Sequence, residues 1–154
     1  MKSGKFALIA SIAIPLTVGF VSSILSGGGM STFGMLNKPP LSPPGWVFPV
    51  VWTILYILMG IASYLVAGSD EEMVTKALSL YSYQLAVNFL WPVFFFSFEW
   101  YLFAFFWILL LWGLVFMTTV LFGRISGVAG LLMVPYLLWI TFAAYLNLGI
   151  WWLN

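Results

Sequence analysis

The chain has 154 residues, of which 64% are hydrophobic, 20% are aromatic and only 6% are charged, with a formal net charge of +1. Soluble domains carry about 25% charged residues, so the few ionisable side chains here cannot cover a core, and the surface must face a bilayer. The chain has no cysteine and no histidine, which excludes disulfides and thiolate or imidazole metal sites, and its charge gives no argument for nucleic acid as a partner.

The first apolar segment, residues 6–26, predicts a membrane-spanning helix, because crossing about 30 Å of hydrocarbon takes about 20 apolar residues. Lys2 and Lys5 precede it, Gly27–Gly29 follow it, and Pro15 lies inside it, which membrane helices tolerate. A signal peptide is the alternative interpretation. Against it, the apolar stretch exceeds the usual h-region of about 7–15 residues, and no clear cleavage pattern follows.

Residues 27–45 are rich in Gly and Pro and predict a stiff, polyproline-like connection, because proline fixes φ and lacks an N–H. Four more apolar runs follow, at about residues 46–67, 75–98, 100–122 and 128–152. These runs are continuous rather than alternating, which favours helices over a β-barrel. The sequence therefore predicts an all-α fold, a bundle of five transmembrane helices that forms one domain over residues 1–154.

The positions of lysine and arginine predict the orientation of this bundle. With five spans, Lys2, Lys5, Lys76 and Arg124 fall on one side of the membrane, and Lys38 falls on the other. Because positively charged loops tend to stay cytoplasmic, we expect a cytoplasmic N-terminus, with the connection 27–45 outside. Short loops without Lys/Arg clusters favour a bacterial cytoplasmic membrane.

Every ionisable carboxylate, ammonium or guanidinium group lies at the end of a predicted helix or in a loop. Charges inside the membrane usually mark ion paths and proton relays, so a proton-coupled pump or a transporter of charged substrates fits poorly. Paired-carboxylate, Ser/His/Asp and Cys/His catalysis lack their parts, and the glycines at 27–29 lack the Lys-Ser/Thr of a phosphate-binding loop. The remaining aromatic and neutral polar side chains suit an apolar, flat or aromatic ligand.

Aromatic and neutral polar residues recur at helical spacing in three of the predicted spans, where they would share a face. They are Trp52 and Tyr56; Gln84, Asn88 and Trp91; and Trp139, Ala143, Leu146 and Asn147. Other interpretations stay open. Tryptophans at span ends, namely Trp46, Trp100, Trp151 and Trp152, are typical interfacial anchors, and the amides also fit hydrogen bonds between helices. Small residues such as Gly19, Ser23 and Gly60 favour close helix packing, within the monomer or in a dimer.

Three motifs in these segments resemble the signature of the TspO/translocator protein family, the tryptophan-rich sensory proteins related to the peripheral benzodiazepine receptor. They are KPPxxPPxWVFPVVWxxLYxxMG at 38–60, YQLAVNxxWPxxFF at 83–96 and PYLxWxxFAxxLN at 135–147. The match runs in order over essentially the whole chain. The resemblance implies a five-helix bundle, often a homodimer, that binds porphyrins and isoquinoline-type ligands in a pocket closed by the first loop.

The same resemblance assigns roles to individual residues. It places Trp52, Asn88, Trp91, Trp139, Ala143 and Leu146 around the ligand, and Pro43, Pro44 and Trp46 in the lid. It also suggests a light-dependent degradation of porphyrin, for which Trp52 and Trp139 are the candidate catalytic residues. Leu41 departs from the family pattern at a position that is often aromatic, and no Lys or Arg follows Arg124, so the C-terminal cholesterol motif of mammalian members is missing.

Three functions remain open at this point. The first is a membrane receptor or sensor that binds a tetrapyrrole or another apolar aromatic molecule, the second is a porphyrin-degrading enzyme, and the third is a porphyrin transporter. The sequence has no inverted repeat of the kind that transporters commonly show, which places transport last. We expect no cofactor and no metal site, with porphyrin as ligand or substrate. A free-base porphyrin fits best, because the usual His and Cys ligands of haem iron are absent; ligation of iron by Tyr or Met is the alternative.

Overall fold

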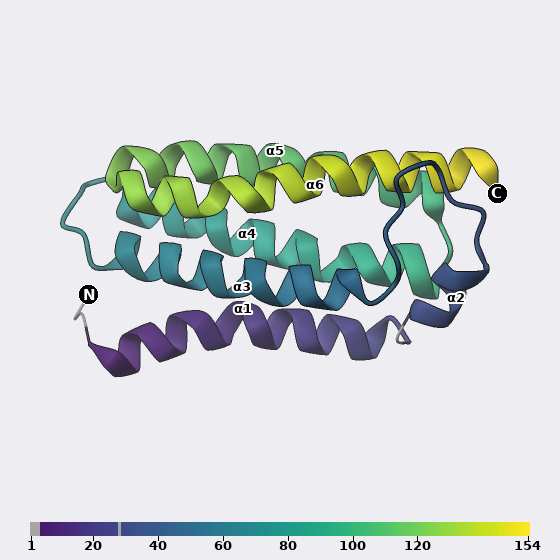
Figure 1. Ribbon diagram of the computed structural model, residues 1–154. Coiled ribbons are helices and arrows are strands. Elements are labelled where there is room, and N and C mark those ends of the chain that lie inside the picture. The colour runs from purple at the N-terminus through teal and green to yellow at the C-terminus, as the bar shows by residue number, and fades with distance from the viewer. Residues whose placement is uncertain (1–3, 28) are drawn as a thin grey trace.

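The computed structural model describes residues 4–27 and 29–154, and this part of the chain contains helices and no strands. In chain order the elements are α1 (Lys5–Leu25), α2 (Met30–Met35), α3 (Val47–Ala67), α4 (Val74–Pro92), the π-helix η1 (Val93–Ser97), α5 (Tyr101–Ile125) and α6 (Gly127–Leu153). The predicted all-α class is confirmed. The long helices run side by side, and α2 lies with the first connection at one end of the bundle (Figure 1).

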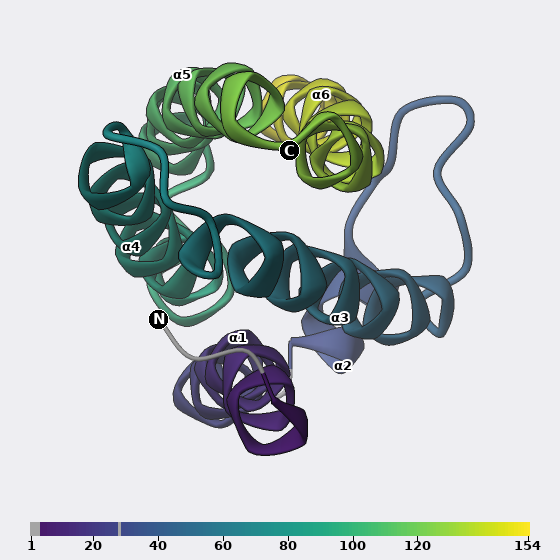
Figure 2. The same ribbon diagram turned by 90° about the vertical axis from the view of Figure 1, so that its left-hand side faces the viewer.

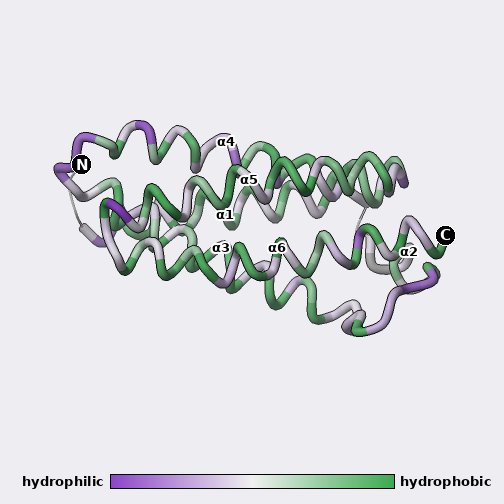
Figure 3. The backbone as a smooth tube through the Cα atoms, turned by 90° about the horizontal axis from the view of Figure 1, so that it is seen from above, coloured by the Kyte–Doolittle hydropathy of each residue, from purple (hydrophilic) through white to green (hydrophobic). Residues whose placement is uncertain are grey.

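Within the described residues, α1, α3, α5 and α6 are long and apolar enough to cross a membrane. The predicted third span, 75–98, is formed by α4 and η1 and is more polar than the others, because α4 carries lysine, serines and two buried amides. Hydrophilic residues gather mainly in the connections and at helix ends (Figure 3). Two predicted features lie outside the described residues, namely Lys2 as an orienting charge and Gly28 of the first connection.

Glycines let two pairs of helices approach closely, which is typical of helix packing in lipid. A Cβ on Gly60 of α3 would lie 2.6 Å from the Cα of Ile12 in α1, and a Cβ on Gly130 of α6 would lie 2.5 Å from the Cα of Gly123 in α5. α1 lies at the periphery of the bundle and packs mainly against α3 (Figure 2). Gly19 of α1 makes a second close contact, because a Cβ there would overlap the ring of Tyr56 in α3.

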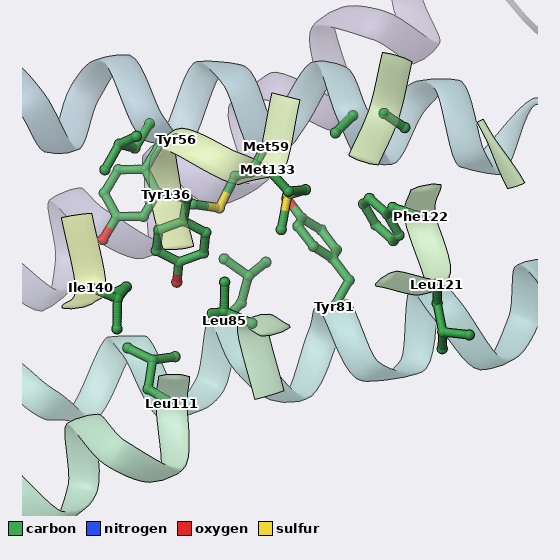
Figure 4. Packing of buried hydrophobic residues seen from close by; sticks show 14 of the residues in the cluster. Tyr56, Met59, Tyr81, Leu85, Leu111, Leu121, Phe122, Met133, Tyr136 and Ile140 are labelled. Atoms are coloured by element: carbon green, nitrogen blue, oxygen red, sulfur yellow. The ribbon is translucent and has the colours of Figure 1, made fainter. Parts of the chain in front are cut away.

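The core lies between α3, α4, α5 and α6 and combines aliphatic side chains with tyrosines (Figure 4). Tyr136, Met59 and Met133 are almost completely buried within it, and Tyr81 packs against Phe122 with ring centroids 5.7 Å apart. This core fills the half of the bundle toward the α5–α6 turn. A second, smaller cluster around Phe33 and Phe95 lies at the opposite end.

Two local predictions need correction. The connection 27–45 is not a polyproline-like loop throughout, because residues 30–35 form the helix α2 before the proline-rich part begins. The predicted third span is also not one regular helix. Pro92 has no N–H to donate to the carbonyl of Asn88, and the chain continues as a π-helix in which the N–H of Phe98 donates to the carbonyl of Val93 (3.1 Å).

Candidate functional site

A cavity of about 530 Å³ lies inside the bundle, near the end that carries α2. Residues of α1, α2, α3, α4, η1 and α6 line it, together with Gly29. Eight of the sequence-predicted site residues meet here: Trp52, Tyr56, Asn88, Trp91, Trp139, Ala143, Leu146 and Asn147. The residues at helical spacing in three separate predicted spans therefore face the same cavity. Gln84, Pro43, Pro44 and Trp46 do not line it.

Aromatic rings form most of the frame of this cavity. Trp52 stacks on Tyr56, with ring centroids 5.5 Å apart, and meets Tyr136 edge-on at 6.1 Å. Across the cavity, Trp139 packs edge-on against Phe48 at 5.8 Å, and Phe48 in turn packs against Phe33 of α2 at 4.9 Å. Such pairs hold each ring in one orientation. The cavity therefore has fixed aromatic walls.

A chain of buried hydrogen bonds ties α3, α4 and α6 together behind these walls. The hydroxyl of Tyr56 donates to Asn88 Oδ1 (2.9 Å), and Asn88 Nδ2 donates to the hydroxyl of Tyr136 (2.7 Å). The Tyr136 hydroxyl donates in turn to Gln84 Oε1 (2.6 Å). Gln84 therefore acts as an interhelical hydrogen-bonding residue, the alternative left open above, and Asn88 combines this role with a place in the cavity wall.

Trp91 and Asn147 form a second polar link, between α4 and α6. The indole N–H of Trp91 donates to Asn147 Oδ1 (2.9 Å), and Asn147 Nδ2 donates to the carbonyl of Tyr101 (2.8 Å). Both polar groups of the Asn147 carboxamide are thus engaged within the protein. Trp91 also stacks on Phe95, with centroids 5.0 Å apart. These residues shape the wall, and their polar groups are already paired.

Trp139 differs from its neighbours because its indole N–H is buried and has no hydrogen-bond partner among the described residues. An unpaired buried donor is costly, and native structures usually satisfy such groups with protein, water or ligand. Trp139 lines the cavity, so its N–H can donate to an acceptor on a molecule bound there. The position of Trp139 well inside a predicted span indicated it as a site residue, but only the tertiary structure reveals that its N–H is unpaired.

The residues predicted as a lid do not cover the cavity. Trp46 is 68% exposed, and the proline-rich segment before it is fastened to α6. The hydroxyl of Tyr145 donates to the carbonyl of Pro40 (2.7 Å), and Asn154 exchanges hydrogen bonds with the backbone of Asn37 (3.1 and 2.8 Å). This segment runs along α6, whereas Gly29 and α2 close the end of the cavity instead.

Sequence reasoning missed the contribution of α1 and the first-loop helix. α1 supplies five lining residues, namely Leu16, Gly19, Phe20, Ser22 and Ser23, while Ser26 follows directly after α1 and α2 supplies Phe33. The one available signal was the spacing of small residues at 19, 22, 23 and 26, which also fits ordinary helix packing. Four lining residues are exposed, Phe20 and Ser23 of α1 and Pro49 and Thr53 of α3, so the cavity opens between these two helices.

No Asp, Glu, Lys or Arg among the described residues lines the cavity, and these residues include no group of three His, Cys, Asp or Glu that could hold a metal ion. The lining therefore offers ring faces, aliphatic groups, serine and threonine hydroxyls and indole or amide donors. Such a wall can bind a large apolar molecule and orient it through a few hydrogen bonds.

Comparison with known proteins yields consistent matches over nearly the full chain. A family model described as the TspO/MBR family matches residues 11–153. The tryptophan-rich protein TspO of Chlorobaculum tepidum is 40% identical over 157 residues, covering 100% of this chain and 99% of that protein. Protein CrtK of Rhodobacter capsulatus is 39% identical over 88% of this chain and 85% of its own length. The translocator protein of Homo sapiens is 38% identical over 84% and 79%, respectively.

Proposed function

The chain belongs to the TspO/MBR family, and on that premise we propose that it is a membrane receptor or sensor that binds porphyrins and isoquinoline-type ligands. Its relatives carry the names translocator protein and tryptophan-rich sensory protein. The binding site in this proposal is the cavity lined by Trp52, Asn88, Trp91 and Trp139.

One observation carries the proposal: a cavity of about 530 Å³ with aromatic walls and no charged lining residue among those described. Drug-sized and cofactor-sized ligands occupy clefts of about 300–1,000 Å³ that are mostly apolar with a few placed polar groups. A planar macrocycle can stack on Trp52 or Trp139, and each aromatic pair contributes about 0.5–1.5 kcal/mol beyond burial. The opening between α1 and α3 suits a ligand that reaches the site from the apolar phase.

The unpaired N–H of Trp139 supports the same proposal. A porphyrin carboxylate or an isoquinoline carboxamide offers the acceptor that this donor lacks. Among the described lining residues there is no His, Cys or Met, and Tyr56 is the one residue of a haem-ligand type, so a free-base porphyrin remains the natural tetrapyrrole. The proposal requires no resident cofactor.

We also propose that α4 with η1 completes a fifth membrane crossing. α4 runs beside the four apolar helices, and α1 begins at the opposite end of the bundle from the end of α6, as an odd number of crossings requires (Figure 1). Lys5, Lys76 and Arg124 lie toward one end and Lys38 toward the other, which supports a cytoplasmic N-terminus in a bacterial cytoplasmic membrane. A homodimer in the bilayer is part of this proposal.

The binding proposal is tested by titrating protoporphyrin against tryptophan fluorescence in wild type and in the double variant Trp52→Phe, Trp139→Phe. We expect the dissociation constant to rise about tenfold to a hundredfold, because the variant loses indole stacking area and the free donor. Trp112→Phe is the matched control, since Trp112 stacks on Phe116 (5.4 Å) and does not line the cavity. Equal affinity of wild type and the double variant would remove the pocket assignment.

A second candidate function is light-dependent degradation of porphyrin, and the contact of Trp52 with two tyrosines favours it. Trp52 lies 5.5 Å from Tyr56 and 6.1 Å from Tyr136, measured between ring centroids. An indole held this way can donate one electron to a photo-excited porphyrin; dioxygen then adds to the porphyrin radical anion, and the adduct returns the electron to the indole radical cation, so that the net reaction is oxygenation of the macrocycle by dioxygen. The candidate fails if the porphyrin spectrum bleaches under light no faster with protein than in detergent alone.

A further inference from the structure

A second pocket lies at the end of the bundle, outside the cavity described above. It has a volume of about 520 Å³ and is shallower, and it forms where the connection from η1 to α5 meets the end of α6. Its wall combines one carboxylate, that of Glu99, with five aromatic side chains, Trp100, Tyr101, Phe103, Trp151 and Trp152. No residue is shared between the two sites.

The carboxylate of this pocket has no cationic partner within the described part of the chain. Lys38 is the basic residue at this end, and its ammonium group donates to the carbonyls of Leu36 (3.1 Å) and Gly34 (3.5 Å) and lies over the ring of Phe33 (5.0 Å). The other acidic residues, Asp70, Glu71 and Glu72, lie in the α3–α4 connection at the opposite end (Figure 1). The carboxylate of Glu99 therefore lies beside the aromatic rings of the pocket without a cationic partner among the described residues.

The aromatic side chains of the pocket are accessible. Trp100 is 52% exposed, Trp151 38% and Trp152 77%, and the rings of Trp151 and Trp152 meet at a wide angle with centroids 6.0 Å apart. The end of α6 adds the partial negative charge of a helix C-terminus. The side-chain oxygen of Asn154, the nearby amide, is already accepting a hydrogen bond from the backbone of Asn37. The pocket thus offers ring faces and the negative charge of Glu99, whose carboxylate is also its main hydrogen-bond acceptor.

This combination selects one kind of ligand chemistry. A quaternary ammonium group donates no hydrogen bond, is attracted to indole and phenol faces within about 6 Å, and gains from a neighbouring carboxylate. A primary ammonium group can also pair with Glu99, but it has no methyl groups for the rings to cover, and its remaining N–H groups would face ring surfaces. Interfacial tryptophans lie at the level of lipid headgroups, and Leu102 and Phe103, at 37% and 47% exposure, continue the pocket wall along α5 toward the apolar zone.

We propose that this pocket, formed by Glu99, Trp100, Tyr101, Trp151 and Trp152, binds the quaternary ammonium headgroup of a bilayer lipid. The carboxylate pairs with the headgroup charge, the rings cover its methyl groups, and one acyl chain descends along Leu102 and Phe103. The tryptophans at these positions then select a lipid, beyond the generic anchoring that their place at the span ends predicts.

Native mass spectrometry of the full chain with phosphatidylcholine, phosphatidylethanolamine and phosphatidylglycerol of identical acyl chains tests the proposal. We expect retention in the order choline, ethanolamine, glycerol, with phosphatidylcholine favoured over phosphatidylglycerol about five- to thirtyfold. Glu99→Gln and Trp152→Leu should each reduce that preference at least about threefold, on the scale of one exposed cation–π or ion-pair contact. Glu71→Gln, an exposed acid without an aromatic pocket, is the matched control and should keep it.

Several outcomes would overturn the proposal. Equal retention of phosphatidylcholine and phosphatidylglycerol by wild type would show that no site exists. An undiminished preference in Glu99→Gln would place the lipid elsewhere, and stronger retention of phosphatidylethanolamine would show an ammonium ion pair without aromatic recognition. Soluble phosphocholine that displaces the lipid at equal concentration would assign the site to a free solute. A protoporphyrin titration of Glu99→Gln serves as the folding control, since the two sites share no residue.

Discussion

Individual side chains divide into those whose polar groups form hydrogen bonds between helices and those whose polar groups have no partner among the described residues. Tyr136 is the clearest holding residue, because its hydroxyl accepts from Asn88 and donates to Gln84 while its ring packs against Trp52. Trp139 is the opposite case, with a buried indole N–H that no described residue satisfies. The helical spacing in the sequence selected residues of both kinds, such as Gln84 and Trp139, without distinguishing them. Only the hydrogen-bond partners separate structural residues from ligand-facing ones.

Removing the hydroxyl of Tyr136 should therefore weaken the bundle without removing its aromatic packing. Tyr136→Phe leaves Asn88 Nδ2 and Gln84 Oε1 without their partner, and we expect a loss of about 1–2 kcal/mol in unfolding free energy, the upper range for hydrogen bonds between membrane helices. Thermal unfolding in detergent measures the effect. Tyr83→Phe is the control, since Tyr83 is 63% exposed; a Tyr136→Phe variant as stable as this control would show that the buried chain contributes nothing.

At the scale of elements, the helices differ in how firmly they are held. α5 and α6 pack along their whole length, whereas α1 packs mainly against α3, yet α1 supplies five residues of the cavity wall. Its closest approach is at Gly60, against the backbone of Ile12 and Ser11. The position of α1 therefore links a helix-packing contact to the shape of the proposed binding site.

A methyl group at Gly60 should move α1 away from α3. In Gly60→Ala the new Cβ would lie 2.6 Å from Ile12 Cα, and backbone cannot yield as a flexible side chain can. We expect a loss of about 1–3 kcal/mol, typical of overpacking, together with weaker protoporphyrin binding. Thermal unfolding and the fluorescence titration measure both effects.

Gly113→Ala is the matched control for this change, because a Cβ at Gly113 in the middle of α5 meets no atom within 4 Å. Alanine there should keep or raise stability, since it is the better helix former. If Gly60→Ala behaves like Gly113→Ala in both measurements, the close contact between α1 and α3 does not set the cavity.

On the scale of the whole molecule, the two ends of the bundle have different characters. One end carries the α3–α4 connection with its acidic residues and the tight α5–α6 turn, where Ser126 Oγ accepts from the N–H of Ala129 (3.3 Å). The other end carries α2, the proline-rich segment and both pockets. The proposed topology assigns the first end to the cytoplasm and the second to the outside.

The natural absence of cysteine makes this topology directly testable. Single variants Ser42→Cys and Ser69→Cys place one thiol in the connection on either side of α3, and Ser97→Cys places one at the last residue of η1. In intact cells, a membrane-impermeant maleimide should label positions 42 and 97, and position 69 only after lysis. Labelling of 69 and 97 from the same side would contradict the fifth crossing, and labelling of 69 alone would invert the proposed orientation.

The sequence by itself determined the helical class and the approximate helix ends. A segment in hydrocarbon must be apolar and must pair its own backbone groups, so each span is visible as a continuous apolar run. The sequence also indicated the stripes of Trp52, Asn88 and Trp139, since residues on one helical face recur at a fixed spacing. It did not predict that α1, α2 and Phe48 line the cavity, and it assigned Pro43, Pro44 and Trp46 to a lid, although they do not line the cavity. The lining positions depend on which faces meet across the bundle, and hydrogen bonds such as Tyr145 to Pro40 join residues far apart in the chain. Local spacing carries no record of such long-range contacts, so only the tertiary structure decided that the indole N–H of Trp139 is buried without a partner among the described residues.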